Sequence, residues 1–144
     1  MRHRCDVRGT IQGRHLTVAV DTNIVVRILV DDDARQVAMA KAVLSRDFAL
    51  LPSVLLETEW VLRSSYKWPR ARIGEALATL IDLPTLREAP PGIGWVIERF
   101  ASGADLADML HLAAAGSAEG FVTFDRRLAK AAGQDTPVPI ETLP

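Results

Sequence analysis

Acidic residues interrupt four apolar stretches of this 144-residue sequence. They are Asp21 in VAVDTNIVVRIL, Glu57 and Glu59 in LLETEW, Asp105 and Asp108 in ADLADMLHL, and Asp125 in FVTFDRR. An unpaired carboxylate in an apolar core costs several kilocalories per mole, so these residues need a compensating group. A cation would offset the repulsion within a carboxylate cluster, and oxygen ligands without Cys or His favour Mg²⁺ or Mn²⁺ over zinc. The pattern therefore indicates a divalent-metal site.

Each of these acids also has an ordinary structural interpretation. An Asp after a strand often forms a turn or caps a helix, and an acid on a helix usually faces solvent. Helical periodicity does not choose between Glu57 and Glu59, because both have apolar neighbours one turn away. Asp108 falls at the edge of the apolar arc of its predicted helix and Asp105 falls near the helix start. This favours Asp108 as a metal ligand and Asp105 as a capping residue.

Short apolar runs alternate with amphipathic segments along the chain. The predicted strands cover residues 16–20, 48–52, 85–90, 121–124 and 137–143. The predicted helices cover residues 23–30, 31–46, 53–66, 69–83, 91–101, 105–120 and 125–133. This alternation is typical of an α/β domain whose parallel sheet is covered by helices.

Three local details accompany this prediction. Ser53 is the expected N-cap of the helix over 53–66, Gly120 ends the helix over 105–120, and the strand over 121–124 is expected to be buried. Asp21 and Asp125 each follow a predicted strand. Sites in open parallel sheets form outside the carboxyl ends of the strands, which is where these two carboxylates should lie.

Composition narrows the class of protein. A chain of 144 residues with 49% apolar residues and a formal charge of −1 suits one globular domain. The single cysteine and three scattered histidines provide neither a disulfide nor a zinc-ligand pattern. No apolar run approaches the length of a membrane span, and the basic start lacks the apolar centre of a secretion signal. We therefore expect a cytoplasmic protein with a disordered extension over residues 1–15 and one domain over 16–144.

The acidic blocks occur in a recognisable order. VAVDTNIVVRILVDDD, LLETEWVLRSSY, ADLADMLHLAAA and FVTFDRRLAK resemble the successive acidic blocks of PIN-domain ribonucleases. The likeness is greatest to the VapC toxins of bacterial toxin–antitoxin pairs, and it spreads over about residues 17–130. The resemblance implies a PIN-like three-layer α/β/α sandwich with a short, mainly parallel central sheet. It also implies a metal-dependent endoribonuclease that hydrolyses RNA phosphodiester bonds.

The resemblance assigns roles to individual residues. The catalytic carboxylates that hold Mg²⁺, with Mn²⁺ as a substitute, would be Asp21, Glu57, Asp108 and Asp125. The supporting residues would be Asn23, Thr123 and Asp105. Basic side chains that could contact RNA phosphates are Arg27, Arg126, Arg127 and those of the stretch RSSYKWPRAR, residues 63–72, which could equally be a helix–turn–helix surface or a protein interface. The implied partners are a small antitoxin protein and a second copy of the chain in a homodimer.

Two other functions remain open. A phosphatase with an aspartyl nucleophile at Asp21 would need a second Asp two residues later, and Asn23 stands there instead. A non-catalytic binding module with the same fold would have no use for the carboxylates. Both alternatives are less well supported than a metal-dependent ribonuclease.

Overall fold

The structure is a computed structural model that describes residues 16–144. Its five strands are β1 (Val18–Ala19), β2 (Phe48–Ala49), β3 (Leu86–Glu88), β4 (Phe121–Thr123) and β5 (Ile140–Thr142). Its seven helices are α2 (Thr22–Val30), α3 (Ala34–Leu44), α4 (Pro52–Ser64), α5 (Arg70–Ile81), α6 (Ile93–Ala101), α7 (Leu106–Ala114) and α8 (Leu128–Ala132). The predicted α/β class with short parallel strands is confirmed. The predicted extension, residues 1–15, lies outside the described residues.

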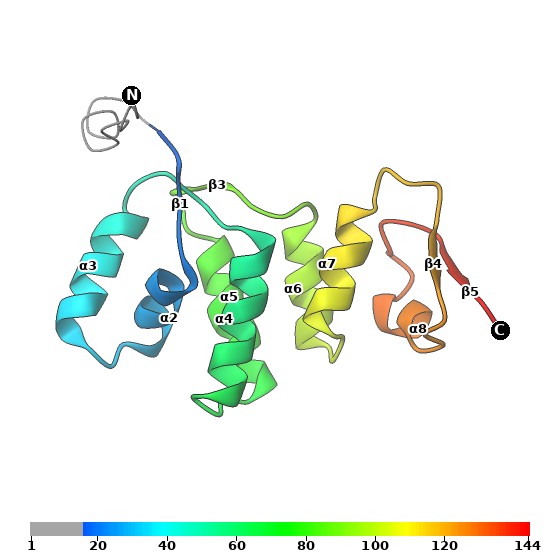
Figure 1. Cartoon of the computed structure of the whole chain (residues 1–144), viewed down its shortest axis with the longest axis horizontal. Helices are drawn as coiled ribbons and strands as arrows, with labels where there is room; N and C mark the ends of the chain where they lie inside the picture. The colour runs from blue at the N-terminus through cyan, green and yellow to red at the C-terminus, as the bar shows by residue number, and fades with distance from the viewer. Residues whose placement is uncertain (1–15) are drawn as a thin grey trace, which may run out of the picture.

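The strands form two short parallel sheets rather than one continuous sheet. One sheet has the order β1-β2-β3, and the other pairs β4 with β5. Figure 1 shows β4, β5 and α8 at one end of the molecule and β1, α2 and α3 towards the other, with α4 to α7 between them. Strands of two or three residues contribute few ladder hydrogen bonds. Helix packing therefore carries most of the architecture.

The core lies between the helices and the three-stranded sheet. Its largest fully buried side chains include Phe48, Leu55, Leu77, Phe100 and Met109. Burying one such side chain stabilises the fold by roughly 1.5–3 kcal/mol. Helices α5 and α6 approach closely, since a Cβ placed on Gly74 would lie 3.3 Å from the Cβ of Ala101.

Two arginine contacts with backbone carbonyl groups fix the elements that carry the later acidic blocks. Arg70 donates hydrogen bonds to the carbonyl oxygens of Phe100 (2.8 Å) and Ala104 (2.7 Å), and its guanidinium lies 4.6 Å from the centre of the Phe100 ring. Arg99 donates through two nitrogens to the carbonyl oxygen of Ala131, at 2.9 and 2.6 Å. The first contact holds the turn before α7, and the second ties α8 to α6.

The basic stretch over residues 63–72 is mainly structural. Arg70 donates to two backbone carbonyl groups of the fold, and the guanidinium of Arg72 lies 3.8 Å from the centre of the Trp68 ring. Tyr66 and Trp68 are partly buried against the core. The stretch is the helix–turn–helix surface between α4 and α5, and these aromatic rings are largely committed to the fold.

Three local predictions were wrong. The N-cap of α4 is Leu51, with Pro52 in the first turn, because proline is pre-organised for that position. Helix α7 ends at Ala114, well before the predicted Gly120. Strand β4 is not buried, since Val122 and Phe124 are 58% and 74% exposed. Because β4 belongs to a two-stranded sheet at the end of the molecule (Figure 1), one of its faces reaches solvent.

Candidate active site

Asp21 lies at the carboxyl end of β1, where it caps helix α2. Its backbone is extended (φ −82°, ψ 159°), and its carboxylate accepts a hydrogen bond from the Thr22 N–H at 2.8 Å. The side chain is exposed, although the apolar residues around it are buried. The expectation of a buried carboxylate at this position is therefore wrong. Water and the positive end of the helix dipole stabilise the charge without a metal.

Thr22 connects Asp21 to Glu57. Thr22 is only 3% exposed, and its hydroxyl donates to a carboxylate oxygen of Glu57 on α4 at 3.1 Å. Glu59 instead accepts from Arg63 one turn later at 2.8 Å. The hydrogen bond and charge of Glu59, with a smaller contribution from Asp105, raise the pKa of Arg63. Glu57 is thus the acid of α4 that joins the first acidic block.

The contact between Thr22 and Glu57 can be tested by a double-mutant cycle. Thr22→Val keeps the shape of the side chain and removes its hydroxyl, so the unfolding free energy should fall by about 1 kcal/mol. The loss should be much smaller when Glu57 is already Ala. Urea denaturation of the two single variants and the double variant measures the coupling. Strictly additive losses would mean that the two side chains do not interact in solution.

Asp105 and Asp108 occupy the start of α7. Asp105 is the N-cap, and its carboxylate accepts from the Asp108 N–H at 3.0 Å. Partial burial, and then the negative charges of Asp105 and Asp125, raise the pKa of Asp108, while His111 acts in the opposite direction. The predicted capping role of Asp105 is confirmed. Asp108 is the half-buried carboxylate around which two others gather.

Asp125 follows β4 in a turn that hydrogen bonds hold on both sides. Its N–H donates to the Thr123 hydroxyl at 3.0 Å, and its carboxylate accepts from the Arg127 N–H at 2.9 Å. The Leu143 N–H donates to the Thr123 carbonyl at 2.8 Å. Thr123 therefore supports the backbone of Asp125. Arg126 and Arg127 are exposed where the chain enters α8.

Asn23 and Arg27 face another feature of the surface. Both line a groove of about 380 Å³ between α2 and α3, together with Met39. Arg27 also forms an ion pair with Asp32 at 3.3 Å. The Asp21 carboxylate is held by Thr22 rather than by Asn23, so the neighbour that orients it is not the one that the sequence suggested.

The carboxylates fall into two groups by the interactions that connect them. Asp21 and Glu57 are linked through Thr22, and Asp105, Asp108 and Asp125 interact through their charges. Within residues 16–144, no group of three or more His, Cys, Asp or Glu side chains is close enough to hold a metal ion. The all-oxygen donor set and the crowding of negative charge at Asp108 suit a hard cation such as Mg²⁺. The donor chemistry fits the metal, and the donors stand in two groups rather than one.

Sequence reasoning did not find the arginines that position these elements. Arg70 and Arg99 act on backbone carbonyls of distant segments, and nothing in their local sequence separates them from surface cations. The position of Thr22 did indicate a functional role, because it is a polar residue within a strongly apolar run.

The fold is of the α/β class, and aspartates follow two of its parallel strands, Asp21 after β1 and Asp125 after β4. The chain matches the model of the PIN domain over residues 18–134, and it belongs to that family. PIN domains are generally metal-dependent nucleases, which indicates a nuclease-type function. No curated protein and no solved structure shows significant similarity to the chain. None of the helices in the described part of the chain is long and apolar enough to span a membrane.

Proposed function

We propose that this protein is a Mg²⁺-dependent endoribonuclease and the toxin of a toxin–antitoxin pair. The proposal rests on membership of the PIN family, on the Thr22 hydrogen bonds that link Asp21 to Glu57, and on the like charges of Asp105 and Asp125 that act on the partly buried Asp108. Such crowding of like charge is costly in a protein that has no use for a cation. Nucleases of this family use a cation for hydrolysis.

The chain's own residues divide the work. Asp108 and Asp125 from one group, and Asp21 and Glu57 from the other, would hold the metal. A bound Mg²⁺ would supply an activated water and offset negative charge on the phosphate. Thr22 and Thr123 orient Glu57 and Asp125 through the hydrogen bonds described above, and Asp105 caps the helix that presents Asp108. Arg126 and Arg127 would contact neighbouring phosphates.

The toxin role rests on the resemblance of the acidic blocks to those of VapC proteins. It implies a small antitoxin that places a basic side chain among the carboxylates, and a homodimer of the toxin. Phosphatase chemistry is disfavoured because the residue two positions after Asp21 is Asn23, which cannot act as an acid or base. A purely binding role would not explain why these carboxylates are placed where their charges repel each other.

Cleavage of a single-stranded RNA by the purified protein tests the proposal. Cleavage should require Mg²⁺ or Mn²⁺, stop with a chelator, and be absent from an Asp21→Asn variant purified in the same way. Equal cleavage by this variant would point to a contaminating nuclease. The toxin role has a separate test, since induced expression in a bacterial host should arrest growth and create new RNA 5′ ends that depend on Asp21.

A further inference from the structure

Phe124 is the most exposed large apolar side chain among the described residues, at 74%. It directly precedes Asp125 and follows β4. The hydrogen bonds between Thr123, Asp125, Arg127 and Leu143 hold the backbone on both sides of it. The ring is therefore presented to solvent by an ordered turn next to a candidate catalytic carboxylate.

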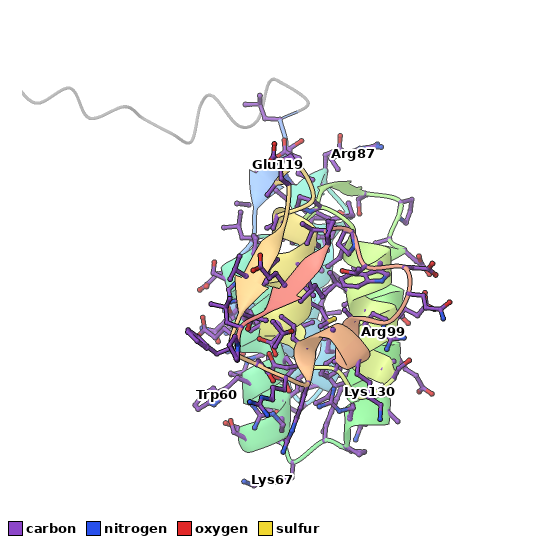
Figure 2. The ribbon with its side chains drawn as sticks, turned by 90° about the vertical axis from the view of Figure 1, so that its right-hand side faces the viewer. Trp60, Lys67, Arg87, Arg99, Glu119 and Lys130 are labelled. Atoms are coloured by element: carbon purple, nitrogen blue, oxygen red, sulfur yellow. The ribbon has the colours of Figure 1, made fainter. Side chains whose placement is uncertain are left out.

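Basic residues without ion-pair partners in residues 16–144 follow Phe124 in the sequence. Arg126, Arg127 and Lys130 are exposed, and Figure 2 shows Lys130 on α8, at the end of the molecule formed by β4, β5 and α8. Three ion pairs occur in the part of the chain that the structure describes, and these three cations take part in none of them. Their charges are available to a phosphate backbone.

An exposed ring among uncompensated cations suits nucleic acid better than a protein partner. The centres of protein interfaces are enriched in aromatic residues and arginine but depleted in lysine, so Lys130 is the cation here that favours nucleic acid over a protein partner. Surfaces that bind single-stranded nucleic acid combine an aromatic ring, on which a base stacks, with cations that follow the backbone. The segment from Phe124 to Lys130 has this composition, together with the carboxylate of Asp125.

We infer that Phe124 stacks on an unpaired nucleobase beside the scissile phosphate while Arg126 and Arg127 contact the flanking phosphates. The inference rests on the proposed function and names Phe124 as the residue that distinguishes unpaired from paired RNA. A base within a duplex has both faces covered by its neighbours, so it offers nothing for the ring to stack on. Phe124 thereby selects unpaired RNA.

Binding without cleavage provides the test. In the full chain carrying Asp21→Asn, with Mg²⁺ present, the anisotropy of a fluorescein-labelled single-stranded RNA of mixed sequence reports affinity. Phe124→Ala should weaken binding about 5- to 150-fold, as loss of a base-stacking ring does, and Phe124→Trp should retain it. Phe124→Leu should behave like Phe124→Ala, because leucine is apolar but has no π-face. The affinity for a duplex of the same sequence should be unchanged by all three.

Val122 provides the matched control. It is an exposed apolar residue within β4, 58% exposed, two positions before Phe124. Val122→Thr should leave the affinity for single-stranded RNA unchanged. Unchanged binding by Phe124→Ala, or normal binding by Phe124→Leu, would overturn the inference and assign the ring to another contact, such as protein docking.

The same measurements separate this inference from the proposed function. A protein that binds single-stranded RNA through Phe124 but never cleaves it would contradict the proposed function alone. If the Phe124→Ala variant cleaves RNA with the same KM and kcat as the wild-type protein, the result would contradict the inference alone. Melting temperatures of all variants establish that each one is folded.

Discussion

Replacement of Asp108 by Asn should abolish RNA cleavage and leave the fold intact. Asn is nearly isosteric with Asp but lacks the charge that would hold a cation. The loss in rate should exceed the roughly 10- to 100-fold that accompanies removal of an outer-shell partner of a metal ligand. Cleavage of a labelled single-stranded RNA under single-turnover conditions measures it.

The same substitution should stabilise the protein near neutral pH. Burial and the charges of Asp105 and Asp125 raise the pKa of Asp108, so its charged form is disfavoured in the folded state relative to the unfolded chain. The stability that the protonated carboxyl contributes is complete below the unfolded pKa and is lost as the pH rises through the folded pKa. Without metal, Asp108→Asn should therefore melt at a higher temperature than wild type near neutral pH, and the difference should vanish in acid.

Asp105→Asn is the matched control for Asp108→Asn. Asp105 caps α7 through the 3.0 Å hydrogen bond from the Asp108 N–H, and Asn is also a competent cap, so the loss should not exceed about 1 kcal/mol of stability. Measurable cleavage should remain. An inactive Asp105→Asn variant beside an active Asp108→Asn variant would exchange the two roles and show that Asp105 is the ligand.

Mn²⁺ or Mg²⁺ should stabilise the folded protein strongly. A ligand that binds only the folded state adds RT ln(1 + [L]/Kd), which is about 2.7 kcal/mol at a hundredfold excess over Kd. For a domain of this size that corresponds to a rise in melting temperature of about 10 °C. Thermal unfolding with millimolar Mn²⁺ and with a chelator measures it. The effect should be lost in a variant that combines Asp21→Asn with Asp125→Asn, one carboxylate from each group.

A second double variant controls for the change in net charge. Glu75 and Asp82 are exposed acids on and just after α5, and both line a groove between α5 and α6 that none of the candidate metal ligands lines. Glu75→Gln with Asp82→Asn removes the same two charges and should keep the full metal effect. A rise of equal size in the Asp21/Asp125 variant would place the bound metal elsewhere on the protein.

Both proposals depend on the different exposures of Asp108 and Phe124. Asp108 is half-buried with like charges nearby, which is a site where a cation would be favourable. Phe124 is exposed on the neighbouring strand end, where an apolar ring has little to contact except a ligand. The two residues belong to α7 and to the turn after β4, and the charge of Asp125, next to Phe124 in sequence, acts on Asp108.

The sequence by itself determined the features that depend on neighbouring residues. The alternation of apolar runs with amphipathic segments predicted the order of strands and helices, because the period of apolar residues selects the local structure. The capping role of Asp105 followed in the same way, since a cap contacts backbone N–H groups within its own first turn. The PIN family was also recognisable, because its acidic blocks occur in order along the chain.

Only the tertiary structure decided the features that depend on contacts between distant segments. Glu57 was separated from Glu59 by a hydrogen bond from Thr22, 35 residues away, and helical periodicity is the same for both acids. Arg70 proved to be structural because carbonyl groups of Phe100 and Ala104 lie within its reach. Phe124 proved to be exposed because it follows β4 at a separate two-stranded sheet where its side chain is left uncovered, and which elements cover a strand end is not encoded in the local pattern.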